Sequence, residues 1–424
     1  MFKKGLIKCI LLAVSGMILF TSCGKKAEDD EALYNSEGKK IVKLFASTEM
    51  CQYFITNEMI ESFNEENPDY AVEICKNTGT LDSVFIMNEH PDIMFEMDLN
   101  QIDGYIDNGY LADLTPYFKK SSDLGMGDLY EGAVDCFTRE GNLYAIPQFA
   151  AVKTLRSRNP GVNESSGWTA EEFLDWLQSD EATYHLITFD RGQLLQYCIT
   201  GELEDYLYGD DGKACFDAPK FISILERINE TKLPSEADVI MLKASTDIPD
   251  EWKEARFFAQ GYLSTLKQVC EEQYCFDGEV INRGYPNDNR EAICYLEPYT
   301  NLGIFESGQC KKGAFEFIKF VLTYPEIDPH ATSDSSTYFW TVNSVREDFF
   351  NRTKTGENEL EYKEDDIIFT NNILLSARVL PYKYHLILDI VDEEASAYFA
   401  GGKDAEQTAK VINSRVQLYL GENK

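Results

Sequence analysis

The residues best suited to bind a ligand are carboxylates, hydroxyls and a guanidinium that come directly after short apolar runs. Such runs predict buried strands. In a doubly wound sheet the ligand meets the loops at the carboxyl ends of the strands. Groups of these types hydrogen-bond a polar ligand without activating it, so the expected chemistry is recognition. This rule selects Ser47, Thr48, Glu49, Asp98, Asp190 and Arg191.

Four further candidates lie in segments expected to cross between two halves of the chain. The extended segment 141–149 contains Pro147, which is expected to prevent it from continuing as a helix or as a central strand. Aromatic rings stack on the apolar face of a sugar, and Trp340 fits stacking and core packing equally well. Asp190 also fits a second role, as the N-cap of the helix that follows it. The four crossing candidates are Gln148, Tyr285, Tyr299 and Trp340.

Signatures of catalysis are incomplete in this sequence. Gly308 and Gly313 have phosphate-loop spacing, but Ala314 and Phe315 stand where Lys and Ser or Thr are required. No Gly-x-Ser-x-Gly elbow is present, and the four histidines lack a zinc-protease spacing. The sequence thus predicts no metal, no cofactor and no enzyme. Glycoside hydrolysis by a carboxylate pair stays an open alternative, because 73 acidic residues guarantee chance pairs.

The amino terminus predicts export. A basic start precedes an apolar run at 9–20, and the small residues after it lead to Cys23, so residues 1–22 are expected to be a signal peptide. Thr21 to Gly24 resemble a bacterial lipobox, which implies lipidation of Cys23; an ordinary signal peptide is the alternative. Residues 23–38 are charged and aperiodic, which predicts a disordered tether. The net charge of −34 disfavours nucleic acid as a partner and hints at neutral or cationic ligands.

The remaining cysteines are not expected to form a disulfide framework. Of eleven, Cys9 leaves with the signal peptide and Cys23 is the lipidation candidate, so the number that remains is odd. None stands in a Cys-x-x-Cys pair. Mostly free, buried thiols are therefore predicted.

The elements that position the candidates begin with a strand at 41–46, a helix at 51–66 and a strand at 70–74. A further apolar run at 91–97 predicts another strand, and such units build a parallel sheet with helices on both faces. A helix at 311–322 has apolar residues at helical spacing.

The second half of the chain has clear helix starts. Thr169 and Glu172 form a capping box, with Trp168 stapled to Phe173 across it, so Trp168 is expected to be structural. The segments 221–228 and 251–270 are also expected to be helical. Two tail helices are predicted on either side of Gly401 and Gly402, the second starting at a capping box of Asp404 and Gln407.

Several of these segments, in this order, resemble the extracellular solute-binding proteins of ABC importers, in the carbohydrate-associated group with a maltodextrin-binding-protein-like fold. The segments are 91–98, 109–116 and 141–147, followed by 279–286, 311–320 and the ending at 401–420. The resemblance implies an α/β, two-lobe periplasmic-binding-protein-like fold of type II. Each lobe would be a doubly wound sheet with flanking helices, with the ligand cleft between them. Lobe 1 would comprise 39–147 and 283–342, and lobe 2 would comprise 148–282 and 343–424.

The same resemblance implies a function. The chain would be a monomeric, lipid-anchored receptor on the outer face of the cytoplasmic membrane, which closes on a small neutral ligand, a mono- or oligosaccharide. It would deliver that ligand to the transmembrane permease subunits of an ABC importer. Tyr285 and Trp340 fall in segments that line the cleft in this family. Two alternatives remain open: a secreted glycoside hydrolase, and a surface sensor that kept the fold without transport.

Overall fold

The structure is a computed structural model. The predicted signal peptide, Cys23 and the candidates Ser47, Thr48 and Glu49 lie outside the residues that it describes. Within those residues, no helix has both the length and the apolar character needed to cross a bilayer. The described residues are 33–46, 54–75, 81, 90–158, 167–178, 183–185, 189–209, 211–233, 256–263, 265–276, 280–324, 339–353 and 363–422.

The first part of the chain forms the expected strand, helix and strand. β1 (Lys40–Ala46) pairs in parallel with β2 (Tyr70–Ile74) on one side and with β3 (Ile93–Glu96) on the other. Between β1 and β2, α1 (Asn57–Glu66) begins at the N-cap Thr56 and buries the apolar face that its periodicity predicts. The predicted parallel sheet of this region is therefore confirmed.

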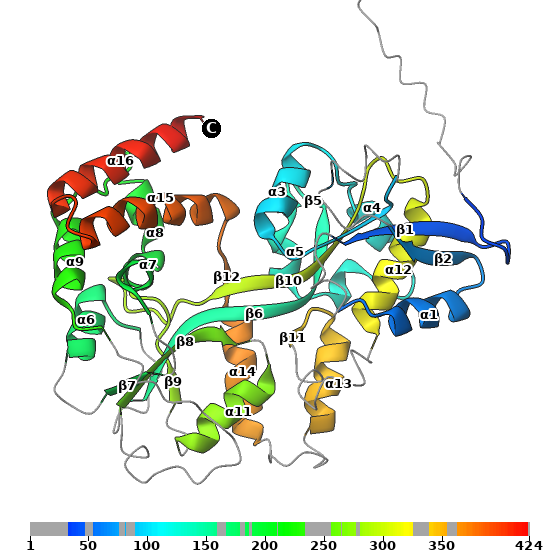
Figure 1. Cartoon of the computed structure of the whole chain (residues 1–424). Helices are drawn as coiled ribbons and strands as arrows, with labels where there is room; N and C mark the ends of the chain where they lie inside the picture. The colour runs from blue at the N-terminus through cyan, green and yellow to red at the C-terminus, as the bar shows by residue number, and fades with distance from the viewer. Residues whose placement is uncertain are drawn as a thin grey trace, which may run out of the picture.

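Two long strands connect this sheet to the rest of the molecule (Figure 1). β6 (Ala145–Arg158) and β10 (Tyr295–Ile304) are antiparallel neighbours, and β10 also pairs with β3. At its far end, β6 pairs with β8 (Arg256–Leu263), which pairs with β7 (Thr183–His185). The path is β2-β1-β3-β10-β6-β8-β7, and three further short strands pair with β6 or β10, so the strands of both lobes belong to one continuous ten-stranded sheet.

Two predictions about local structure were wrong. Pro147 does not stop a central strand, because β6 runs through it. Among the described residues, β6 pairs at Pro147 only with β10, since the pairing with the short strand at Phe339–Trp340 begins at Phe149 and that with β8 at Val152. A residue without an amide hydrogen is therefore tolerated there. The predicted helix 251–270 is also incorrect, because residues 256–263 form β8 against the long strand β6.

The other elements cover this sheet. α12 (Lys311–Thr323) and the two tail helices occur where they are predicted. The remaining bounds are α3 (Leu99–Asp107), α4 (Thr115–Lys120), η2 (Met126–Asp128), α5 (Glu131–Cys136), β4 (Thr138–Arg139), β5 (Asn142–Leu143), α6 (Ala170–Gln178), α7 (Arg191–Thr200), α8 (Leu203–Leu207), α9 (Pro219–Glu230), α11 (Leu266–Cys275), β9 (Val280–Asn282), β11 (Phe339–Trp340), α13 (Asn343–Thr353), α14 (Glu364–Ser376), β12 (Arg378–Val379), α15 (Tyr382–Phe399) and α16 (Ala405–Glu422).

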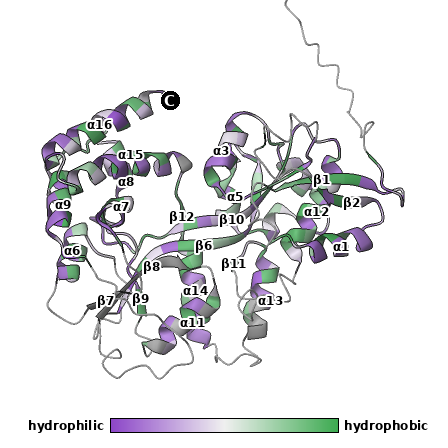
Figure 2. Cartoon of the chain, in the orientation of Figure 1, coloured by the Kyte–Doolittle hydropathy of each residue, from purple (hydrophilic) through white to green (hydrophobic). Residues whose placement is uncertain are grey.

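The buried side chains form two large hydrophobic cores. The first core lies around β1, β3, α1, α3 and α12, and it extends to α11 and α14. The second core lies among α6, α7, α9, α15 and α16. β6 and β10 run between the two groups of helices (Figure 1), and most helices carry hydrophobic and hydrophilic residues side by side (Figure 2). This separation of the cores is what makes the molecule two-lobed.

The helix start at Trp168 has the predicted structure. Thr169 and Glu172 exchange the two hydrogen bonds of a capping box, and the Trp168 and Phe173 ring centroids are 4.7 Å apart. The Trp168 indole also donates to the carbonyl oxygen of Gly284, 3.0 Å away. Trp168 is therefore a structural clasp between α6 and the returning chain. Seven of the described cysteines form no disulfide, and all of these except the partly exposed Cys215 are buried, as predicted.

Candidate functional site

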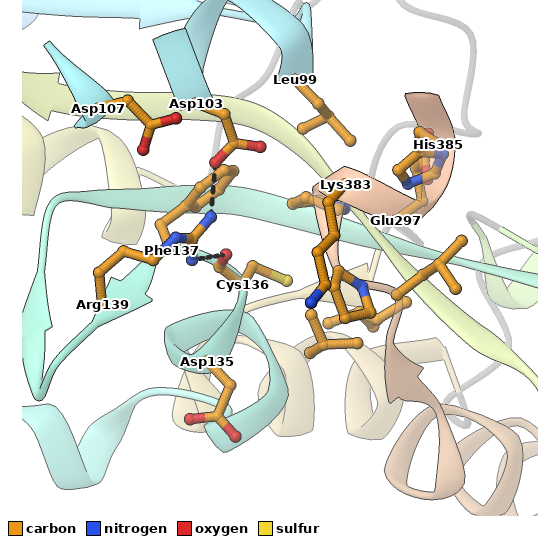
Figure 3. A pocket seen from close by; sticks show the side chains of 15 residues that line it. Leu99, Asp103, Asp107, Asp135, Cys136, Phe137, Arg139, Glu297, Lys383 and His385 are labelled. Carbon is orange, nitrogen blue, oxygen red and sulfur yellow. Dashed lines mark hydrogen bonds and ion pairs between the residues drawn. The ribbon is translucent and has the colours of Figure 1, made fainter. Parts of the chain in front are cut away.

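A cavity of about 450 Å³ lies between the two cores. One wall comes from α3, α5 and β4, and the apolar side chains of α3 and α5 belong to the first core. The opposite wall comes from the segment that joins β12 to α15 and from the first turn of α15, a helix of the second core. β10 lines the cavity between the two walls (Figure 3). A molecule bound here contacts both lobes.

The first wall is built around an ion pair. Asp103 on α3 is 5% exposed, and its carboxylate accepts a hydrogen bond from Arg139, with 2.5 Å between Nη2 of Arg139 and Oδ1 of Asp103. The same guanidinium donates to the carbonyl oxygen of Cys136, 3.0 Å away. These bonds hold Arg139 against α3 and α5. Asp107 and Asp135 line the same wall and are exposed, so their oxygens are available to a ligand.

Burial raises the pKa of Asp103 to about 6, although the Arg139 guanidinium acts in the opposite direction. Between about pH 4 and pH 6 the folded chain therefore keeps a proton on Asp103 that the unfolded chain releases. This group stabilises the fold fully below that window, and its contribution is lost as the pH rises through it.

We expect the substitution Asp103→Asn to remove this pH dependence. Relative to the variant, the native chain should lose about 2–3 kcal/mol of unfolding free energy between pH 4 and pH 7, as follows from a rise of about two pKa units. Urea unfolding of both proteins at several pH values measures the difference. If the two proteins differ in unfolding free energy by the same amount at every pH, the raised pKa of Asp103 is contradicted.

The second wall carries a different set of charges. Lys383 is exposed on the first turn of α15, where its ammonium lies 3.3 Å from the hydroxyl oxygen of Tyr208. Burial and the charge of Lys153 lower the pKa of His385, so this imidazole is neutral at pH 7. On β10, Glu297 forms an ion pair of 2.8 Å with Lys153.

The cavity combines polar groups with apolar surface. Phe137, Leu296 and Pro298 are buried residues that line it beside the charged groups. Carboxylates accept hydrogen bonds from hydroxyl groups and Lys383 donates them, while apolar faces contact C–H groups. Small-molecule sites in proteins typically have cavities of about 300–1,000 Å³ with this composition. Among the described residues, no group of three or more His, Cys, Asp or Glu is arranged to hold a metal ion.

Several candidates from the sequence have structural roles. Asp98 is the N-cap of α3 and accepts from the amide of Asn100 at 2.9 Å, so it positions the helix that carries Asp103. Asp190 caps α7 through a capping box with Gln193. Arg191 donates to the carbonyl oxygen of Asn229, 3.2 Å away.

The crossing candidates lie close to β6 and β10. Gln148 is fully buried, and its amide donates to the carbonyl oxygen of Val321 at 3.0 Å. Trp340 is 1% exposed and packs edge-on against Phe149, with 4.7 Å between the ring centroids. Of the two roles considered for Trp340, its surroundings therefore match core packing.

The two crossing tyrosines lie in different places. Tyr299 is half-buried and lies beside the pair of Trp340 and Phe149. Tyr285 is buried against Tyr295, in the second core. The structure thus groups Gln148, Tyr299 and Trp340 around the paired strands, and none of the described candidates lines the cavity.

The residues that line the cavity were not selected from the sequence. Asp103, Asp107 and Arg139 come from a helix and a two-residue strand, and Lys383 from a helix about 240 residues further on. One signal existed: Asp103 is an acidic residue on the buried face of an amphipathic helix, where a charge requires a partner.

The overall architecture is similar to that of several solved structures. One is an ABC substrate-binding protein from Listeria monocytogenes in complex with cycloalternan, with a TM-score of 0.56, 15% identity, and coverage of 90% of this chain and 99% of that one. Another is the sugar-binding protein MalE from Xanthomonas citri, with a TM-score of 0.58, 15% identity, and coverage of 90% and 98%. Maltose-bound T. maritima MalE3 gives a TM-score of 0.56 at 16% identity, with coverage of 89% and 99%.

The likeness is one of structure. No protein-family model matches the sequence, and no curated protein matches it either. The similar structures nevertheless cover about nine-tenths of the chain, and two cores joined by long shared strands are present here. The chain therefore has the two-lobe α/β fold of the extracellular solute-binding proteins of ABC importers.

Proposed function

We propose that this chain is the substrate-binding component of an ABC importer, and that it captures a small neutral, hydroxyl-rich ligand such as a mono- or oligosaccharide. The observation that supports this most is the cavity of about 450 Å³ whose walls come from both cores. A ligand that contacts both walls favours the closed arrangement over the open one, and this shift in population is the signal a permease recognises. The names of two similar structures state a bound ligand, which is cycloalternan in one and maltose in the other.

The rest of the proposal concerns placement in the cell. We assign residues 39–147 and 283–342 to lobe 1, and 148–282 and 343–424 to lobe 2. The chain is exported, anchored by lipid at Cys23 and monomeric, and it delivers its ligand to the transmembrane subunits. Its function is binding, without catalysis. The first core also includes side chains of α11, α13 and α14, so these helices of lobe 2 pack directly against lobe 1.

A thermal-shift panel of sugars and polyols tests the proposal. A ligand that binds only the folded chain stabilises it by about 2.7 kcal/mol when its concentration is 100 times its Kd. We expect at least one mono- or oligosaccharide to raise the melting temperature. Assaying the same mixtures for reducing-sugar release tests the hydrolase alternative, and release that is lost on one Asp or Glu substitution would overturn the binding-only function.

Two exposed cavity residues locate the site. Asp107→Asn and Lys383→Ala each remove one hydrogen-bonding charge while leaving buried contacts intact, and each should weaken the Kd of the hit about tenfold, or about 1.4 kcal/mol. The matched control is Lys410→Ala on α16, an exposed lysine away from the cavity, which should leave the Kd unchanged. If all three variants bind the sugar as tightly as the native chain does, the sugar binds outside this cavity.

A further inference from the structure

A second cavity, of about 350 Å³, lies on the other side of the segment that joins β12 to α15. Three stretches of chain form it: the end of α7 with the start of α8, the loop at 287–293, and the residues 378–384. The residues Val379, Leu380 and Pro381 line both cavities. The second cavity is therefore a separate space that shares one wall with the first.

The lining of the second cavity is strongly acidic. Five carboxylate side chains line it, and Arg378 is the basic residue among the lining. Glu204 and Asp205 are exposed, whereas the side chain of Glu202 is only 4% exposed. Ionised carboxylates accept hydrogen bonds and donate none. The five are Glu202, Glu204, Asp205, Asp288 and Glu291.

Most charged and hydroxyl donors around this cavity already have partners. Lys220 forms ion pairs with Glu202 and with Asp288, the latter at 2.8 Å. Arg378 forms one of 2.5 Å with Glu291. The Tyr384 hydroxyl donates to Glu204 at 3.0 Å.

Two further donors are engaged in the same way. The Tyr295 hydroxyl donates to the carbonyl oxygen of Thr200 at 3.0 Å, and the amide nitrogen of Asn287 donates to the carbonyl oxygens of Tyr285 and Glu291. Acceptors are therefore in excess, and a ligand of this cavity must bring both donors and positive charge.

Glu202 shows that the excess is not balanced within the protein. Its Oε2 accepts from Lys220, but its Oε1 is buried and has no hydrogen-bond partner among the described residues. A buried carboxylate oxygen without a partner costs free energy. A donor supplied by a ligand would recover that cost.

We propose that the second cavity binds a small primary amine, whose ammonium group lies among the carboxylates of Glu202, Glu204 and Asp205 without contacting all three at once. An ammonium supplies three donors and one positive charge, which match the excess acceptors. A bare metal ion fits less well, because no three acidic, His or Cys groups of the described chain are arranged to coordinate one. A neutral sugar would bring acceptors as well as donors. The proposal does not depend on the function of the first cavity.

Isothermal titration of the full chain with 1,4-diaminobutane at constant ionic strength tests the proposal. The uncharged analogue 1,4-butanediol has the same length, and calcium chloride represents a metal ion. We expect the diamine to bind and the diol and calcium not to bind. Equal heats for diamine and diol, binding of calcium alone, or no binding of the diamine would each overturn the proposal.

Variants assign the amine to the cavity. Glu204→Gln and Asp205→Asn are exposed and isosteric, and each should weaken the diamine Kd about tenfold by removing one charge-assisted bond. Glu202→Gln should weaken it further, and its melting temperature shows whether it still folds. The control Glu406→Gln removes an exposed charge of α16 and should leave the Kd unchanged. If the control lowers affinity as much as the cavity variants, the diamine binds the acidic surface in general and the site is disproved.

Discussion

Replacing Arg156 by methionine will destabilise the fold by about 3–5 kcal/mol, because it leaves a buried carboxylate without its partner. Arg156 on β6 is 1% exposed and Glu272 on α11 is 4% exposed. The two side chains form a bidentate ion pair. Nε of Arg156 lies 2.7 Å from Oε2 of Glu272, and Nη2 of Arg156 lies 2.5 Å from Oε1 of Glu272. Once the guanidinium is gone, the Glu272 charge remains in an environment from which water is excluded.

A double substitution separates the ion pair from packing. Arg156→Met with Glu272→Met removes both charges and keeps similar volume, so it should recover most of the loss. The control is Lys410→Met, which breaks an exposed pair with Glu406 at 3.5 Å and should change stability by less than about 0.5 kcal/mol. Denaturant unfolding of all variants measures the differences. If Arg156→Met is as stable as Lys410→Met, the ion pair of Arg156 and Glu272 contributes nothing to stability.

Gly284→Ala will also destabilise strongly, by about 3 kcal/mol or more. Gly284 has φ of +63°, and an added Cβ would lie 2.3 Å from the backbone nitrogen of Ile293 and 2.4 Å from the carbonyl carbon of Ala292. These are backbone atoms of the segment that forms an isolated bridge with Tyr285, so no side chain can rotate away. The expected loss of stability has two sources. An alanine is strained in the left-handed backbone conformation, and its Cβ overlaps the backbone atoms nearby. The Trp168 clasp, which donates to the Gly284 carbonyl, should loosen with it.

Gly109→Ala is the matched control for the backbone term. Gly109 has φ of +69°, but an added Cβ there would meet nothing within 4 Å. It should therefore cost only about 1–2 kcal/mol from conformation alone. Thermal melting and near-ultraviolet circular dichroism, to which Trp168 contributes together with the other tryptophans, measure both variants. Equal losses in the two would show that the close approach at Gly284 does not matter.

The parts of the fold that could be predicted from sequence are those whose pattern is local. The helix at 311–322 and the capping box at Thr169 follow from spacing within a dozen residues. The long strand β10 was not predicted, because Pro298 and Asn301 interrupt its apolar pattern. Within the part of the chain that the structure describes, β10 pairs only with β6 at Pro298, and β6 pairs only with β10 at Pro147. The long-range pairing therefore accommodates both prolines.

The candidate site was harder to predict than the fold. The rule that ligands meet strand ends selected Asp98, which instead caps the helix carrying Asp103. Arg139 meets Asp103 only because β4 folds back against α3, and Lys383 reaches the same cavity from the far end of the chain. No local pattern encodes these encounters, since each depends on how separate elements pack.

The continuity of β6 from one lobe to the other has a mechanical consequence. Fourteen residues at about 3.3 Å each extend roughly 45 Å, and β10 is hydrogen-bonded alongside much of that length. Because β6 is one uninterrupted strand, any change of angle between the lobes must bend it together with the part of β10 that is paired with it. The pair of strands therefore supplies a restoring torque, and a ligand must hold the closed shape against a stiffness built into the backbone.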